Sequence, residues 1–163
     1  MDRIKKYLLL ISLKVYSFQC DNFFLAGNMT SSKILLSICT RCRDDREDVY
    51  DSCGGTRLAD EFMKRVPADV DFSVRGVYCM SQCKRSCVVS FTAPDRFTYT
   101  FGDLDPENPG DLDAILNFAK MYKNAPEGFV LRNDRPKVMR AGILGRFPPI
   151  ETTSELVSTL EKS

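Results

Sequence analysis

The sequence predicts an α/β fold with a mixed sheet, in the order strand, helix, strand, hairpin and helix. Two observations support this prediction. Short apolar runs alternate with amphipathic segments, and two β-rich runs are joined so tightly that they must pair antiparallel. The chain has 163 residues, enough for one domain with its own core, and its 44% hydrophobic and 28% charged residues are typical of a soluble globular protein.

The first half of the predicted fold is a strand–helix–strand unit. Residues 33–38 (KILLSI) form a short apolar run that suits a buried strand. Residues 56–66 (TRLADEFMKRV) carry apolar side chains at helical spacing, and Pro67 ends that helix. Residues 71–78 (DFSVRGVY) are predicted to form the second strand, so each strand is followed directly by a cysteine.

The second half of the predicted fold is a hairpin followed by a helix. Residues 88–94 (VVSFTAP) and 97–102 (FTYTFG) are β-rich runs separated by Asp95 and Arg96, as in an antiparallel hairpin. Residues 112–124 (LDAILNFAKMYKN) place their apolar side chains in one stripe, which predicts an amphipathic helix.

Three segments are expected along the chain. Residues 1–28 match the pattern of an export signal only in part, because Lys14 interrupts their apolar run. This run is also too short for a membrane span of about 20 residues. We expect this segment to be a disordered extension, or to result from a start of translation that was assigned too far upstream. Residues 29–150 are expected to be the folded domain, and residues 151–163 a C-terminal tail or a short helix.

Histidine is absent from the sequence, which excludes Ser-His-Asp and Cys-His catalytic groups and mixed Cys/His zinc sites. Any metal must be held by thiolates, carboxylates or backbone oxygens. An odd number of cysteines would leave one thiol over in a disulfide framework, so metal or redox use is favoured. The seven cysteines are residues 20, 39, 42, 53, 79, 83 and 87.

The stretch CMSQCKRSC contains Cys79, Cys83 and Cys87. On one helix the outer two would lie about 12 Å apart, which metal–sulfur bonds of about 2.3 Å cannot span. We therefore expect a tight turn in which Cys79 and Cys83 are ligands and Cys87 stands just behind them.

The remaining ligands are expected from the loop after the first strand, which offers Cys39, Cys42 and Cys53. The C-x-x-C of Cys39 and Cys42 alone is only moderately specific, since thioredoxin-type redox pairs share it. Its combination with a second cysteine loop after another strand is more informative and indicates a metal centre.

The run CMSQCKRSCVVSFTAPDRFTYTFGDLDPEN resembles the second half of the thioredoxin-like [2Fe-2S] ferredoxins, and VYDSCGGTRLADEF resembles their Ser-Cys leading into a helix. The resemblance implies a thioredoxin-like β-α-β-β-α core with a mixed sheet. It also implies that Cys39, Cys53, Cys79 and Cys83 are the cluster ligands, and that Cys87 occupies a position where those ferredoxins have proline.

Over roughly residues 33–150 the chain is still more similar to an uncharacterised bacterial family of predicted metal-binding proteins. Its pattern has C-x-x-C, then C-x-x-x-C-x-x-x-C, then FGDLDP and a late RP…R.GIL.R.PP segment, all present here. This resemblance implies Cys42 in place of Cys53 as the fourth ligand. The two resemblances differ at this position, and both alternatives stay open.

The charged segments of the sequence are not expected to form separate sites. Arg41, Arg43, Lys84 and Arg85 would offset the negative charge of a thiolate-ligated cluster, or are solvated loop residues. Residues 131–146 are basic but contain no aromatic side chain for base stacking, so we expect a surface segment. The acidic run that precedes the last predicted helix fails the calcium-loop template and suits a helix start.

The sequence thus predicts a small metal–thiolate protein, a cytoplasmic [2Fe-2S] electron carrier that transforms no substrate. Its expected partner is an unidentified redox protein, with neither nucleic acid nor membrane involved, and a homodimer is also compatible with the sequence. One alternative is a Zn²⁺ protein with a structural or metal-delivery role. Another is a C-x-x-C thiol–disulfide protein, which would leave the extra cysteines idle.

Overall fold

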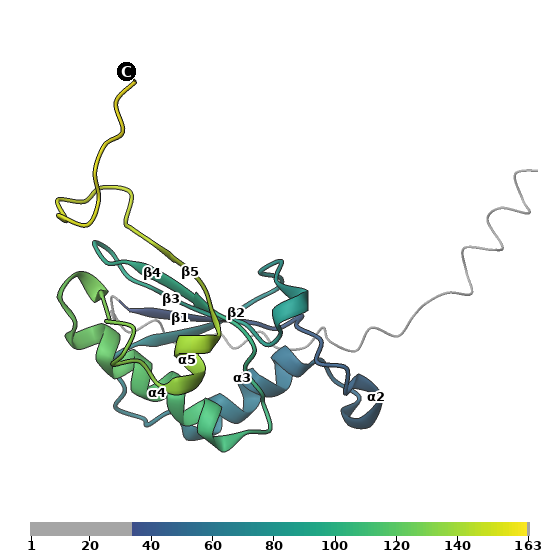
Figure 1. Cartoon of the computed structure of the whole chain (residues 1–163). Coiled ribbons are helices and arrows are strands. Elements are labelled where there is room, and N and C mark those ends of the chain that lie inside the picture. The colour runs from purple at the N-terminus through teal and green to yellow at the C-terminus, as the bar shows by residue number, and fades with distance from the viewer. Residues whose placement is uncertain (1–33, 163) are drawn as a thin grey trace, which may run out of the picture.

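The computed structural model describes residues 34–162, in which a five-stranded sheet in the order β2-β1-β3-β4-β5 forms one layer and the long helices lie against one of its faces (Figure 1). β1 pairs parallel with β2, and the other neighbours pair antiparallel. The mixed sheet confirms the predicted α/β class, and the strand order of β2-β1-β3-β4 is that of the thioredoxin-like core. The strands are β1 (Leu35–Cys39), β2 (Ser73–Val77), β3 (Val89–Thr92), β4 (Thr98–Phe101) and β5 (Ile143–Phe147).

The two long helices, α3 and α4, pack beside each other on the same face of the sheet (Figure 1). α4 begins at Pro109, which occupies its first turn, and the Asn108 side chain caps it by accepting a hydrogen bond from the backbone N–H of Gly110 (3.0 Å). The helices are α2 (Glu47–Tyr50), α3 (Gly54–Arg65), α4 (Pro109–Asn124) and α5 (Lys137–Ala141), with short 3₁₀ turns η1 (Cys83–Arg85) and η2 (Pro126–Gly128).

Aromatic rings fill the core between the β3–β4 hairpin and α4. Alternation along the two strands places Phe91, Tyr99 and Phe101 on the covered face, and all three are fully buried. The ring of Phe118 on α4 lies 4.7 Å from that of Phe101 and 4.9 Å from that of Phe91, measured between centroids. Such pairs each contribute about 0.5–1.5 kcal/mol beyond area burial, so this half of the fold is stabilised without any cysteine.

The basic segment 131–146 is more than the surface segment expected from the sequence. It forms α5 and then β5, which extends the sheet beside β4. Arg135 is 5% exposed, its guanidinium lies 5.1 Å from the Tyr99 ring centroid, and it donates a hydrogen bond to the Val130 carbonyl (2.8 Å). The interpretation as a surface segment is therefore wrong for Arg135.

Residues 151–162 contain no helix and follow β5 as an extended tail with a turn. Leu156 and Leu160 are 61% and 91% exposed, so the apolar side chains that a helix would need to bury have nothing to pack against. The expected extension at residues 1–28 lies outside the described residues. None of the helices within residues 34–162 is long and apolar enough to cross a membrane.

Candidate metal centre

The topology brings the two cysteine loops to the same edge of the sheet. β1 lies between β2, which runs parallel to it, and β3, which runs antiparallel. The carboxyl ends of β1 and β2 and the amino end of β3 therefore meet. Cys39 is the last residue of β1, and its backbone N–H donates to the Val88 carbonyl (3.0 Å). Cys79 comes just after β2 and Cys87 just before β3.

Three thiols form a buried row at this edge. Cys39, Cys42 and Cys87 are 3%, 2% and 0% exposed. The Cys39 thiol is hydrogen-bonded to that of Cys42, which in turn contacts the thiol of Cys87. The sequence predicted Cys87 behind Cys79 and Cys83, and did not reveal its contact with Cys42, because that contact depends on the pairing of β3 with β1.

Two further thiols lie on the exposed loop between β2 and β3. Cys79 and Cys83 are both exposed and both free. The sulfur of Cys79 accepts a hydrogen bond from the backbone N–H of Ser81 (3.3 Å), and the backbone N–H of Met80 interacts with the sulfur of Cys39. The exposed loop is thus already in contact with the buried row.

Burial and mutual contact keep the thiols of Cys39 and Cys42 protonated. The hydrogen bond with Cys42, reinforced by burial, raises the pKa of the Cys39 thiol far above its ordinary value. For Cys42 the bond with Cys39 lowers the pKa, but the contact with Cys87 and burial outweigh it and raise the pKa to about 12. Because metals bind thiolates, metal binding by this pair would release protons.

The first turn of α3 presses directly on the loop after β1. The backbone N–H of Gly55 donates to the Cys42 carbonyl (3.0 Å), and a Cβ at Gly55 would stand 1.9 Å from the carbonyl oxygen of Cys39. Only glycine permits this approach. The positive end of the helix dipole consequently lies beside Cys39 and Cys42, where it would stabilise thiolate charge.

The six candidate ligands therefore differ in their surroundings. Cys39, Cys42 and Cys87 are brought together, whereas Cys79 and Cys83 lie on the neighbouring exposed loop. Cys53, at the residue that precedes α3, is buried and disulfide-bonded, so it offers no free thiol. Within residues 34–162, no group of three or more cysteine or carboxylate side chains has the arrangement of a metal site. The cysteine side chains are the kind of donor that a thiophilic metal prefers, but the two loops do not hold them in the arrangement of a metal site.

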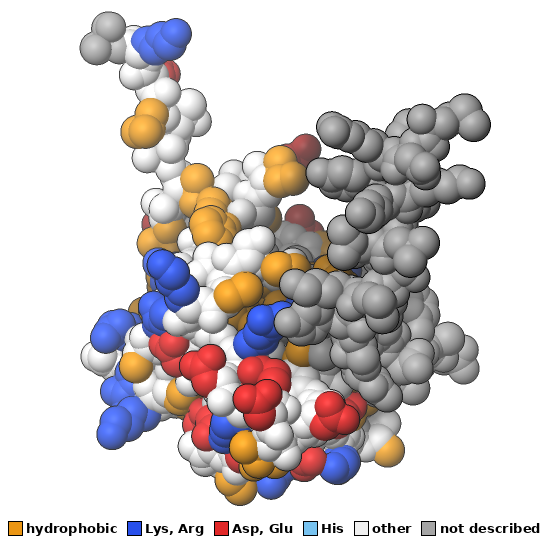
Figure 2. Space-filling model, turned by 90° about the vertical axis from the view of Figure 1, so that its right-hand side faces the viewer, with side chains coloured by type: hydrophobic (Ala, Val, Ile, Leu, Met, Phe, Trp, Pro, Cys, Tyr) orange, Lys and Arg blue, Asp and Glu red, His pale blue; other side chains and the backbone are white. Residues whose placement is uncertain are grey.

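The charge around the loops is mixed rather than uniformly basic. Arg85 forms an ion pair with Asp103, with Nε 2.7 Å from Oδ1, so its charge is already compensated. The guanidinium of Arg41 lies 4.8 Å from the Tyr78 ring centroid. Acidic side chains gather on one face of the molecule (Figure 2), and the first turn of α2 carries Glu47 and Asp48. The structure therefore does not support the expectation that all four nearby cations offset the negative charge of a thiolate-ligated cluster. These cations are Arg41, Arg43, Lys84 and Arg85.

The fold and the grouped cysteines together define an α/β protein with a thiol-rich site at the carboxyl end of β1. The chain belongs to the family described as "Protein of unknown function (DUF1636)", whose model matches residues 36–149. This match confirms the resemblance to an uncharacterised family inferred from the cysteine pattern. No curated protein matches the chain significantly.

Solved structures with a similar fold include two of a thioredoxin-like [2Fe-2S] ferredoxin from Aquifex aeolicus. The first is 17% identical, covers 74% of this chain and 99% of its own, and has a TM-score of 0.44. The second, a crystal structure of the wild type, is 16% identical, covers 71% of this chain and 99% of its own, and has a TM-score of 0.41. These likenesses concern the fold and assign no role to any residue here.

Proposed function

We propose that this protein holds a [2Fe-2S] cluster on cysteine thiolates and works as an electron carrier. The observation that supports this proposal is the grouping of five free thiols, from two loops, at one edge of the sheet. Iron–sulfur clusters need soft thiolate ligands and commonly take them from more than one loop. The absence of histidine from the sequence leaves thiolates as the principal donors.

Cys39 and Cys42 from the first loop and Cys79 and Cys83 from the second are the proposed ligands. Cys42 is preferred to Cys53 because its thiol contacts that of Cys39. Cys87 remains an alternative ligand, whereas Cys53 is disulfide-bonded and could bind a metal only after reduction. When bound, the cluster would supply one-electron transfer; the protein would hold it, exclude water on the buried side and set its potential.

Backbone N–H groups near the sulfurs are the features by which this chain would tune that potential. Ser81 donates to the Cys79 sulfur, Met80 interacts with the Cys39 sulfur, and the amino end of α3 lies beside Cys42. Each stabilises negative charge on sulfur, which favours the reduced state. The exposed loop of Cys79 and Cys83 is the side from which an unidentified cytoplasmic redox partner would approach.

Zinc is the second candidate, since the same four thiolates suit it and a structural or delivery role needs no redox change. A thiol–disulfide catalyst using Cys39 and Cys42 is less well supported. Such catalysts need a thiol with a lowered pKa, whereas here burial and mutual contact raise the pKa of both thiols.

The visible absorption spectrum and metal content of anaerobically purified protein test the proposal. We expect a brown sample with absorption at roughly 400–600 nm, together with iron and acid-labile sulfide in equal amounts. A colourless protein that carries zinc would contradict the cluster and support the second candidate. Anaerobic reconstitution with iron and sulfide, followed by the same measurements, guards against loss of the cluster during purification.

A further inference from the structure

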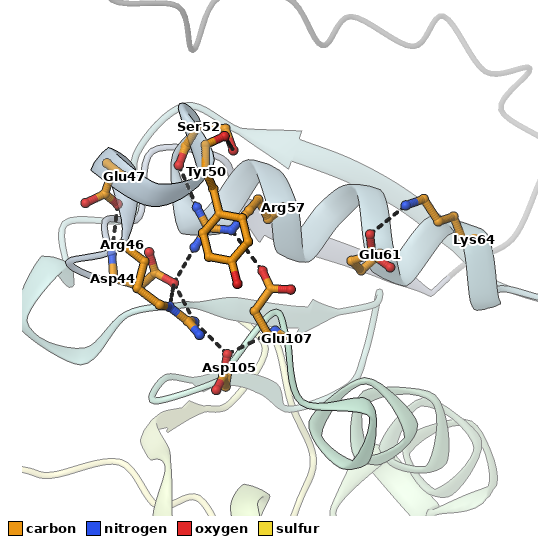
Figure 3. Close-up of polar contacts among 10 residues, drawn as sticks. All are labelled: Asp44, Arg46, Glu47, Tyr50, Ser52, Arg57, Glu61, Lys64, Asp105 and Glu107. Atoms are coloured by element: carbon orange, nitrogen blue, oxygen red, sulfur yellow. Dashed lines mark hydrogen bonds and ion pairs between the residues drawn. The ribbon is translucent and has the colours of Figure 1, made fainter.

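Arg57 is at the centre of a network of polar contacts on the loop that carries Cys42 and Cys53 (Figure 3). Although charged, Arg57 is only 8% exposed. Its Nη2 donates to Asp44 Oδ2 (2.6 Å), its Nη1 to the Ser52 carbonyl (2.6 Å) and its Nε to Glu107 Oε1 (3.0 Å). One guanidinium thus joins two points of this loop to the segment that precedes α4.

The two loop acceptors of Arg57 flank the candidate ligands. Asp44 is two residues after Cys42, and Ser52 is the residue before Cys53. Between them the chain forms only α2, a four-residue helix with no buried residue. Apolar packing therefore contributes little to holding this stretch, and Arg57 connects its two ends directly.

Further contacts strengthen the same connection. Arg46 donates to Asp44 Oδ2 from both Nε (2.8 Å) and Nη2 (2.6 Å), and its Nη2 also reaches Asp105 Oδ1 (2.6 Å). The ring centroid of Tyr50 lies 4.2 Å from the Arg57 guanidinium carbon. By contrast, the Glu61–Lys64 pair farther along α3 is exposed and joins no other element (Figure 3).

We propose that Arg57 is a positioning residue of the metal centre, which holds the loop between Asp44 and Ser52 so that Cys42 faces Cys39 and Cys87. The planar guanidinium binds three acceptors at fixed angles, which a lysine ammonium cannot reproduce. As a role in metal binding this rests on the proposed function, but the positioning of Cys42 is testable on the metal-free chain.

The first test is alkylation by iodoacetamide of the reduced, metal-free full chain, with the rate at each cysteine followed by mass spectrometry. In Arg57→Lys we expect Cys42 to react about tenfold faster than in the wild type, because the loop opens more often. Cys87 should keep its rate, since its backbone is hydrogen-bonded to Leu104 in both directions. Arg65 lies on the same helix as Arg57 and forms an exposed ion pair with Asp113 of α4, so Arg65→Lys is the matched control and should change no rate.

The outcomes separate positioning from a general loss of stability. An unchanged rate at Cys42 in Arg57→Lys would overturn the proposal. Equal acceleration at Cys42 and Cys87 in both Arg57→Lys and Asp44→Asn would also overturn it, because it would mean global unfolding. Selective acceleration at Cys42 in Arg57→Lys supports it.

The second test uses reconstituted protein and compares visible circular dichroism and reduction potential among wild type, Arg57→Lys and Arg65→Lys. A change in both properties confined to Arg57→Lys supports a role at the metal centre, and identical spectra and potentials contradict it. If the wild type takes up no cluster, the proposed function fails, while the alkylation rates still decide whether Arg57 positions Cys42.

Discussion

The two cysteine loops follow parallel, adjacent strands, yet they differ in nearly every physical property. The loop after β1 has buried thiols, lies under the first turn of α3 and is connected by Arg57 to the segment before α4. The loop after β2 exposes Cys79 and Cys83. Short-range hydrogen bonds, such as that from Ser86 Oγ to the Cys83 carbonyl (2.7 Å), hold the part that carries these thiols, while its end is joined to residues 103–104 through Arg85 and Cys87. The first loop is thus preorganised, and the second can adjust to a ligand or partner.

We expect the largest loss of stability when a side chain is added where α3 contacts the first loop. In Gly55→Val the new Cβ would meet the Cys39 carbonyl, so we expect a loss of about 3 kcal/mol or more in the free energy of unfolding. Chemical denaturation measures it. Gly110→Ala in α4 is the control, since its Cβ would meet only the Asn108 side chain at 3.3 Å. Equal stability of the two variants would contradict preorganisation of the first loop.

Thiol reactivity compares the loops directly. In the reduced, metal-free chain at pH 7.5, we expect Cys79 and Cys83 to be alkylated about 100-fold faster than Cys39 and Cys42. Exposure favours the outer pair, and the raised pKa values leave the inner pair almost without thiolate. Similar rates at all four cysteines would show that the first loop opens as readily as the second.

Acid should loosen the first loop through Asp44. Burial by itself would raise the pKa of this carboxyl, but hydrogen bonds from Arg57 and Arg46 outweigh burial and hold the pKa below its ordinary value. A carboxyl with a lowered folded-state pKa adds stability above its unfolded pKa of about 3.9, and this stability is lost as the pH falls through the lower folded value.

We therefore expect denaturation midpoints to fall as the pH drops below about 4, and to fall less steeply in Asp44→Asn. Asp113→Asn, at an exposed ion pair, should retain the wild-type slope. A wild-type slope in Asp44→Asn would mean that this carboxyl contributes nothing to the acid sensitivity.

The smallest effect is expected on the second loop. Arg85→Gln removes the ion pair with Asp103, and both side chains are largely exposed to solvent. Water and salt screen such pairs, so the denaturation midpoint should not change measurably. A clear loss of stability would show that the second loop is held more firmly than the exposed thiols suggest.

Periodicity predicted most of the fold, because alternation in the β3–β4 hairpin and the apolar stripe of α4 are local patterns. β5 was not predicted, since its sequence is short and follows a segment rich in proline, glycine and basic residues. The cysteines of the site were identified from spacing and resemblance. The contact between Cys42 and Cys87 was not, because it depends on how β3 lies beside β1. Arg57 and Asp44 were missed because two charges 13 residues apart carry no recognisable pattern.

The central claim is that thiolates from both loops hold one metal centre, with Cys42 as the second ligand of the first loop. Iron and acid-labile sulfide, quantified after anaerobic reconstitution of Cys42→Ser and Cys53→Ser, test it most directly. The account predicts that Cys42→Ser loses most of its iron and sulfide, whereas Cys53→Ser retains wild-type amounts. Full retention in both variants would contradict the account.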